Sequence, residues 1–157
     1  MATASDPVAV VTKWMDALNK GDAAAAASSF ASDGMLAANA PCLVTTPCTG
    51  PAILARFQGM VAVHNKFTII GSPIAVGNLV QIRRELRNDN STAAGVERLL
   101  DTHQEMVQGD KIVSDIGVND YSDAQTVKLT IWQQASATGS PAAKPAASAA
   151  ASAKPAG

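Results

Sequence analysis

The chain has 157 residues and a formal net charge of −1, which suits one domain with a single sizeable core. Aromatic residues make up only 4% of the sequence, and the near-neutral charge and the lack of a long apolar run argue against nucleic acid and membranes as partners. Residues 1–4 lack the basic and apolar parts of a secretory leader, so we expect a cytoplasmic protein or a mature form without its leader.

The first part of the chain is predicted to be mainly helical. Asp6 followed by Pro7 is typical of a helix start, because an acidic N-cap accepts backbone N–H groups and proline suits the first turn. Apolar residues then recur at helical spacing until Gly21, and Asp22 can cap an alanine-rich second helix. The predicted elements are a helix ending at Gly21, a helix over 23–30, a strand over 35–38, an irregular stretch over 39–48, and a helix opening at Gly50-Pro51.

From residue 66 the hydrophobic period changes to that of strands. β-Branched and apolar segments alternate with turn signals, of which Gly77-Asn78 is a two-residue hairpin signal. Helices followed by a meander of antiparallel strands are typical of the α+β class. The predicted strands cover 66–76, 79–87, 96–107 and 111–119, with a polar loop over 88–92.

Residues 134–157 are predicted to form a disordered tail behind a single domain over residues 5–133. From about Ala135 the sequence consists mainly of alanine, proline, serine and glycine, with two lysines. Such a segment cannot bury enough apolar surface to offset its chain entropy.

Two cysteines, Cys42 and Cys48, lie in the irregular stretch. Two cysteines are too few for a zinc site, and neither histidine has ligand spacing beside them, so we expect no metal. A local disulfide is one alternative. We expect two free, half-buried thiols instead, because no secretory signal is visible.

Four short runs resemble the SnoaL-like branch of the nuclear transport factor 2 (NTF2)-like superfamily: Val10-Val11-x-x-Trp14-Met15-x-Ala17-Leu18-Asn19-x-Gly21-Asp22, Phe30-Ala31-x-Asp33, Gly50-Pro51-x-Ile53 and Gly109-Asp110-Lys111-Ile112. The resemblance covers roughly residues 6–122. It implies a curved antiparallel sheet wrapped on three N-terminal helices, a cone also known as a cystatin-like α+β roll. It also implies an apolar pocket at the open end and homodimers formed through the outer face of the sheet.

Ketosteroid isomerase, a member with this fold, uses a carboxylate base and an oxyanion hole made of a tyrosine and a protonated aspartic acid. The base position falls on Ala38, which cannot carry a proton, and the tyrosine position falls on Trp14. The aspartic acid position falls on Thr102, with Asp101 predicted to lie on the opposite face of the strand. The sequence therefore argues against ketosteroid isomerase chemistry.

The limonene epoxide hydrolases are similar in fold and activate water with an arginine and two aspartates. Arg84 falls near their arginine, but their carboxylate positions fall on Leu86 and Gly117. Asp115 lies two residues before Gly117, on the same predicted face. This set is incomplete, so the sequence does not support that reaction either.

A smaller polar group is left as the candidate site. If Ile82 and Leu86 face the interior of the cone, alternation places Arg84 there as well, and a buried arginine needs a partner. Asp115 is the best candidate, so Arg84 and Asp115 are the candidate catalytic residues. The structural alternatives are an ion pair near the rim or an outward Arg84 in a dimer interface.

The rest of the predicted pocket comes from the helices and from the inward faces of the strands. Asp101, His103 and Glu105 alternate along one strand, and we interpret them as a solvated or dimer-facing stripe rather than a metal site. The predicted ligand-binding residues are Trp14, His64, Ile82, Leu86, Leu100, Thr102, Gln104 and Asn119.

Two functions follow from these patterns. The first is an apolar pocket that binds or transforms a small apolar molecule bearing one or two oxygens, without a cofactor, by isomerase, lyase, cyclase or hydratase chemistry if it is an enzyme. The second is a non-catalytic module for dimerisation or interaction. A hollow interior with Arg84 and Asp115 at its floor would favour the first, and an interior filled by side chains would favour the second.

Overall fold

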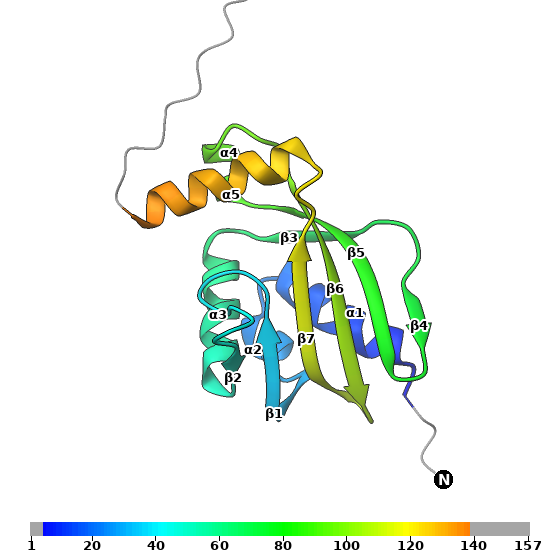
Figure 1. The fold of residues 1–157 in the computed structure, drawn as a ribbon. Coiled ribbons are helices and arrows are strands. Elements are labelled where there is room, and N and C mark those ends of the chain that lie inside the picture. Colours follow the sequence, from blue (N-terminus) through cyan, green and yellow to red (C-terminus); the bar gives the residue numbers. More distant parts are fainter. Residues whose placement is uncertain (1–4, 139–157) are drawn as a thin grey trace, which may run out of the picture.

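The computed structural model describes residues 5–138, in which helices cover one face and one end of a curved seven-stranded sheet (Figure 1). The elements in chain order are α1 (Pro7–Asn19), α2 (Ala23–Ala27), β1 (Phe30–Ala37), β2 (Cys48–Thr49), α3 (Pro51–Ala62), β3 (Lys66–Ile69), β4 (Ile74–Val76), β5 (Leu79–Arg87), α4 (Asp89–Ala93), β6 (Leu99–Gln108), β7 (Lys111–Asn119) and α5 (Ala124–Ala137). None of the helices within residues 5–138 is both long enough and apolar enough to span a membrane.

Helix α1 begins and packs as its sequence predicts. The side chain of Asp6 accepts a hydrogen bond from the backbone N–H of Val8 at 3.0 Å, and Pro7 occupies the first turn. The buried face of the helix includes Trp14, whose ring stacks on Phe57 of α3 with a centroid distance of 5.5 Å. All three phenylalanines of the chain pack with this tryptophan, so the few aromatic side chains are concentrated at the centre of the core.

The strand order is β2-β1-β7-β6-β5-β3, and β4 pairs with the end of β5. All neighbouring strands are antiparallel except β1 and β7, which run parallel, so the sheet is mixed rather than purely antiparallel. A parallel neighbour needs a long connection, which the elements from β2 to β6, with α3 and α4 among them, provide here. The predicted α+β class and the curved sheet on three N-terminal helices are confirmed.

Several boundaries differ from the prediction for local reasons. The predicted strand over 66–76 is two strands, because the chain turns at Gly71, which has a φ of +72°. The predicted loop over 88–92 contains α4, whose N-terminus is closed by a capping box between Asn88 and Ser91.

Helix α5 was not predicted, and it continues past residue 133 to Ala137, so the predicted domain boundary falls inside a helix. Its buried Leu129 forms a second small core with Ala94 and Leu99, and α4 and α5 together cover one end of the sheet (Figure 1). Residues 139–157 of the predicted tail lie outside the described residues.

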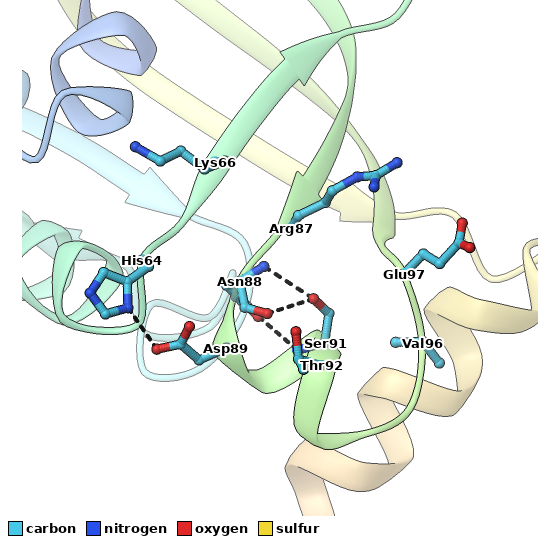
Figure 2. Close-up of a pocket in the computed structure, with 9 residues that line it drawn as sticks. All are labelled: His64, Lys66, Arg87, Asn88, Asp89, Ser91, Thr92, Val96 and Glu97. Atoms are coloured by element: carbon cyan, nitrogen blue, oxygen red, sulfur yellow. Dashed lines mark hydrogen bonds and ion pairs between the residues drawn. The ribbon is translucent and has the colours of Figure 1, made fainter.

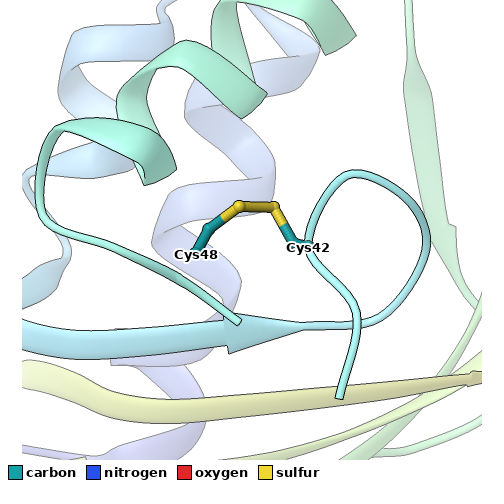
Figure 3. Close-up of a disulfide and its surroundings, with 2 residues drawn as sticks. All are labelled: Cys42 and Cys48. Atoms are coloured by element: carbon teal, nitrogen blue, oxygen red, sulfur yellow. A yellow bond between two sulfur atoms is a disulfide. The ribbon is translucent and has the colours of Figure 1, made fainter. Parts of the chain in front are cut away.

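Cys42 and Cys48 form a disulfide, so the expectation of two free thiols is wrong (Figure 3). The bond joins the irregular loop after β1 to the two-residue strand β2. Both cysteines are buried, at 1% and 8% exposure. The pairing holds together a loop that otherwise has few regular hydrogen bonds.

We expect the double variant Cys42→Ser/Cys48→Ser to lose roughly 2 kcal/mol of unfolding free energy, because the bond no longer restricts the unfolded chain. Urea denaturation of the oxidised protein and of the variant measures the difference. The intact mass should rise by two hydrogens on reduction. An unchanged mass, or equal stabilities, would contradict the pairing.

Candidate functional site

The inward face of the sheet carries a cluster of charged residues at the register of β5, β6 and β7. In the β5–β6 pair Arg84 lies opposite Asp101, and in the β6–β7 pair Glu105 lies opposite Asp115. His103 lies between them on the same face of β6 by alternation. These side chains are buried, between 0% and 2% exposed. We call Arg84, Asp101, His103, Glu105 and Asp115 the polar cluster.

The guanidinium group of Arg84 is held on three sides. Nε donates to Oδ1 of Asp101 at 2.8 Å and Nη2 donates to Oδ2 at 3.1 Å, which is the two-pronged geometry that arginine favours. The guanidinium carbon also lies 4.4 Å from the ring centre of Phe67 and 5.1 Å from that of Trp14. Nη1, by contrast, is buried and has no hydrogen-bond partner among the described residues.

The imidazole of His103 bridges the two aspartates. Its Nδ1 lies 2.5 Å from Oδ1 of Asp115, and its Nε2 lies 3.3 Å from Oδ2 of Asp101 and 2.6 Å from Nη2 of Arg84. In the imidazolium, Nε2 therefore has Asp101 to donate to. In the neutral ring with the proton on Nδ1, Nε2 can accept from Arg84. Both protonation states have partners in place, which suits a group that takes up and releases a proton.

The charged groups of the polar cluster shift one another's pKa values. Burial and the Arg84 charge lower the pKa of His103, but the carboxylates of Asp115 and Asp101 outweigh them and raise its pKa to about 9. Burial raises the pKa of Asp101, but Arg84 and His103 outweigh it and hold that pKa well below its ordinary value. Burial, followed by the charge of Asp115, raises the pKa of Glu105. Glu105 therefore favours its neutral form more than an exposed glutamate does.

Glu105 connects the polar cluster to the aromatic core. Nε1 of Trp14 donates to Oε2 of Glu105 at 3.1 Å, while Oε1 of Glu105 and Oδ2 of Asp115 have no hydrogen-bond partner within residues 5–138. His103, Glu105 and Asp115 offer ligand atoms within 4.8 Å of one another, and these residue types can bind a metal. Because His103 is hydrogen-bonded to Asp115 and Glu105 favours its neutral form, we interpret the arrangement as a proton-sharing network.

Gly117 makes room for the imidazole. It lies directly opposite His103 in the β6–β7 pair, and a side chain there would collide with Nε2 and Cε1 of His103 and lie 2.9 Å from Cβ of Ala38. We expect Gly117→Ala to lower the unfolding free energy by roughly 2 kcal/mol, because the ring must leave its two aspartates. Urea denaturation measures this change.

Gly59→Ala is the matched control, because a side chain at Gly59 meets nothing within 4 Å and the residue lies inside α3. Alanine is the better helix former, so this variant should be slightly more stable than the wild type. A Gly117→Ala protein as stable as the wild type would mean that the ring does not occupy this place.

A narrow pocket reaches the polar cluster from the side of α3 and the loop after β1. The pocket and its open mouth together enclose about 380 Å³ of empty space. The cavity itself is only about 20 Å³, which is room for about one water molecule. The cone interior is thus nearly filled. We call this pocket the slot; its lining residues are Trp14, Leu36, Ala38, Asn39, Cys42, Arg56, Met60, Phe67, Arg84, Leu86, Asp101 and His103.

A second, wider hollow of about 570 Å³ lies on the surface where α3, β3, β5 and α4 meet, and Figure 2 shows its lining. Its charged groups other than Glu97 are already paired: His64 lies 2.7 Å from Asp89, Arg87 contacts Glu85, and Lys66 donates to a backbone carbonyl. This groove therefore lacks the unpaired buried atoms that distinguish the polar cluster.

Four of the predicted site residues lie where the sequence placed them. Arg84 and Ile82 face the interior, and Trp14 and Leu86 line the slot. Asp115 is also buried, but the predicted pair between it and Arg84 is wrong: Asp101 binds Arg84, and Asp115 binds His103. The reason is the register, which sets Asp101 directly across from Arg84.

The predicted inward face of β6 is wrong by one residue. Leu100, Thr102 and Gln104 lie on the outer face, and the stripe predicted to be solvated, Asp101 to Glu105, points inward. A shift of one residue exchanges the two faces of a strand. Asp101, His103 and Glu105 were therefore missed as site residues.

Two other predicted residues lie outside the slot. The side chain of His64 is exposed and lines the surface groove, so it does not contribute to the interior pocket. Asn119 faces inward, where its Oδ1 accepts a hydrogen bond from Nδ2 of Asn39 at 3.0 Å. Asn39 lies in the loop at the mouth of the slot, so Asn119 supports that loop rather than lining the pocket.

No protein-family model and no curated protein sequence matches the chain. Solved structures do. IdmH from Streptomyces antibioticus, a proposed polyketide cyclase, matches with a TM-score of 0.63 at 19% identity, over 80% of this chain and 99% of that one. An NTF2-like protein of unknown function from Cytophaga hutchinsonii matches with a TM-score of 0.58 at 14% identity, over 76% and 95%.

SalBIII, an epoxide hydrolase/cyclase-like enzyme of pyran ring formation in the polyether salinomycin, matches with a TM-score of 0.60 at 17% identity, over 74% of this chain and 92% of that one. At these identities the likeness establishes the fold. The chain has the fold of the NTF2-like proteins, as its resemblance to the SnoaL-like branch predicted.

Proposed function

We propose that the domain binds a small oxygen-bearing molecule in the slot and acts on it by general acid catalysis through His103. The observation that carries the proposal is the buried imidazole between Asp115 and Asp101, in contact with Arg84, whose Nη1 has no partner among the described residues. A structural ion-pair network has no need of an unsatisfied buried donor, which costs stability.

The roles follow from the contacts. Asp115 holds Nδ1 and so leaves Nε2 on the side of Arg84 and Asp101, both of which line the slot. A pKa of about 9 keeps His103 protonated near neutral pH, so it can give a proton to a ligand oxygen. The free N–H of Arg84 can polarise the same oxygen.

The simplest reaction of this kind is the hydration of a carbonyl. Water adds to the carbonyl carbon, the carbonyl oxygen takes the proton from His103, and the water proton returns to the imidazole. The fold is shared with cyclase-like and hydrolase-like enzymes, which supports an acid–base reaction at a carbon–oxygen bond. The narrow slot favours a short ligand; a larger one requires Met60 and the loop after β1 to move aside.

Oxygen exchange tests the proposal. 2-Butanone is incubated with the protein in H₂¹⁸O and the incorporated label is measured by mass spectrometry. We expect exchange above the buffer rate, and a loss of at least about 100-fold in His103→Asn. The His64→Asn variant should exchange as fast as the wild type. Exchange that is equal in His103→Asn and wild type would overturn the role of His103.

The outer face of the sheet supports a second proposal, a homodimer. Val76, Leu79 and Met106 lie side by side there by register, and the same face carries exposed apolar side chains of β7 opposite Gln104 and Thr102. Their exposures reach 61% at Val118 and 73% at Val76, and such a surface is typical of an interaction site. The nearly filled cone interior fits this alternative, in which the domain is an interaction module. The apolar residues are Ile74, Val76, Leu79, Met106, Ile116 and Val118.

We expect Val118→Asp to convert the dimer to a monomer, because each copy would bury an unpaired charge in the interface. Sedimentation equilibrium at several concentrations measures the mass. Val44→Asp is the control, since Val44 is 67% exposed in the loop near the slot, away from the sheet face. A wild-type protein that is monomeric at 100 µM, a concentration on the order of a weak complex's dissociation constant, would contradict the dimer.

The disulfide between Cys42 and Cys48 gives an indication of the cellular compartment in which the protein works. We infer that the domain works in an oxidising compartment, which is the secreted alternative rather than the expected cytoplasmic one, because disulfides persist there and are rare in the cytosol. The intact mass of protein isolated from its host tests this inference: a mass two hydrogens higher would place the protein in a reducing compartment.

A further inference from the structure

Two arginines line the slot, and neither has a hydrogen-bond partner for every guanidinium nitrogen among the described residues. Arg84 enters from β5 and keeps Nη1 buried without a partner. Arg56 enters from the middle of α3, is partly buried, and has no hydrogen-bond or ion-pair partner within residues 5–138. Arginine is rarely buried without a carboxylate, so the unpaired guanidinium of Arg56 beside the paired one of Arg84 requires an explanation.

The carboxylates nearby cannot neutralise Arg56. Asp101 is the only acidic residue among those lining the slot, and both of its oxygens are engaged by Arg84 and His103. Burial, followed by the positive charge of Arg84, lowers the pKa of Arg56, so the two cations destabilise each other. Arg56 therefore lines the slot without a carboxylate partner among the described residues.

The remaining lining indicates the shape of the missing partner. Apolar and aromatic side chains surround the two guanidinium groups, among them Leu36, Met60 and Leu86. The slot is small, so it suits a compact group. A carboxylate is flat, carries one negative charge, and offers two oxygens that can each accept from a guanidinium.

We propose that the slot binds the carboxylate of a small organic acid between Arg56 and Arg84, with the short apolar part of the acid against the neighbouring aromatic and aliphatic side chains. The inference rests on the proposed function only in placing the ligand in the slot. It adds the chemical class of the ligand and identifies Arg56 as a binding residue.

Butyrate and butyramide provide a matched pair of probes, because they have nearly the same shape and differ in charge. Binding is followed by titration of ¹⁵N-labelled protein, using the indole signal of Trp14. We expect butyrate to bind at least about 10-fold more tightly than butyramide. Arg56→Gln should remove that preference, and Arg87→Gln, a surface arginine paired with Glu85, should keep it.

Arg84 is part of the folded core, so Arg56→Gln is the informative variant. It should unfold at a temperature no lower than the wild type, because it removes a like charge facing Arg84. A clear loss of stability would reveal a structural partner of Arg56 and overturn the proposal. Equal binding of the two probes, no binding of either at 50 mM, which is on the order of the weakest affinity a small acid site would show, or equally tight binding of inorganic phosphate would also overturn it.

The outcomes separate this proposal from the proposed function. Butyrate binding that depends on Arg56, without oxygen exchange in 2-butanone, would support the acid-binding site and overturn the proposed hydration reaction. Oxygen exchange that depends on His103, without a preference for butyrate over butyramide, would support the proposed hydration reaction and overturn the acid-binding site.

Discussion

Replacement of Arg84 by leucine is expected to lower the free energy of unfolding by about 3–5 kcal/mol, because it leaves Asp101 charged and buried without its main partner. The loss extends beyond one ion pair. Arg84 also packs between the rings of Phe67 and Trp14 and lies against His103, so its removal opens the centre of the core. Urea denaturation at pH 7, monitored by tryptophan fluorescence, measures the change.

Arg83→Leu is the matched control on the same strand. Arg83 points to the outer face, where it donates to Asp120 at 2.9 Å and has a side chain that is 51% exposed. An exposed pair of this kind contributes about 0–1 kcal/mol. If the two variants lost the same stability, Arg84 would not be the buried centre of the network. Asp101→Leu combined with Arg84→Leu should be more stable than Arg84→Leu alone, since no unpaired charge is left.

The fold could be predicted because its local signals agree with one another. An acidic cap and proline start α1, glycine ends it, and apolar residues at helical spacing define its buried face. The hairpin at Gly77-Asn78 and the period of two that follows it place β4 and β5. Resemblance to a known family then supplied the arrangement of these elements in space. Each step depended on residues close together in the chain.

The candidate site could be predicted only in part, because β6 reverses the usual rule that polar residues face solvent. Asp101, His103 and Glu105 point inward, and the outer face of the same strand carries Thr102 and Gln104. Both faces are polar, so hydrophobic alternation does not fix the phase of the strand. One residue in the sequence carried the missing information. A buried Arg84 needs a carboxylate directly opposite it, so each possible register of β6 against β5 can be judged by whether it places one there.

Helix α5 and the disulfide escaped prediction for different reasons. α5 buries only Thr126 and Leu129 fully, so it has almost no apolar stripe by which a helix is recognised. The disulfide closes a short loop, and its formation depends on how the loop after β1 is folded rather than on the spacing of Cys42 and Cys48. The helix is thus fixed by contacts with distant segments, and the disulfide by the fold of one short loop.

Stability is expected to fall as the pH rises from 6.5 to above 9. The pKa of His103 is raised to about 9 in the folded protein from an ordinary 6.5. The folded state therefore binds more protons than the unfolded state in this window, and unfolding becomes easier as the pH increases. This histidine contributes its full stabilisation below pH 6.5 and loses it through pH 9, an amount on the order of 3 kcal/mol.

The neighbouring carboxyl groups determine the limits of this window. The pKa of Glu105 is raised by burial and by Asp115, so its contribution has the same sign and also declines as the pH rises. The pKa of Asp101 is lowered by Arg84 and His103 against the effect of burial, so its contribution is lost only in acid. Urea denaturation at pH 6, 7, 8 and 9 measures the slope. His103→Gln should flatten it, and His64→Gln, in an exposed pair with Asp89, should leave it unchanged.

The ¹⁵N shifts of the imidazole of His103 report its protonation directly. An imidazolium that persists to about pH 9 requires that Asp115 and Asp101 together outweigh burial and Arg84. The ring is then an acid at neutral pH, which the proposed hydration of a carbonyl needs. A ring that loses its proton below pH 6.5 would instead accept from Nη2 of Arg84, and the same residues would then form a general base with the proton on the Asp115 side. The sign of the pH dependence of stability therefore distinguishes an acid catalyst from a base in this site.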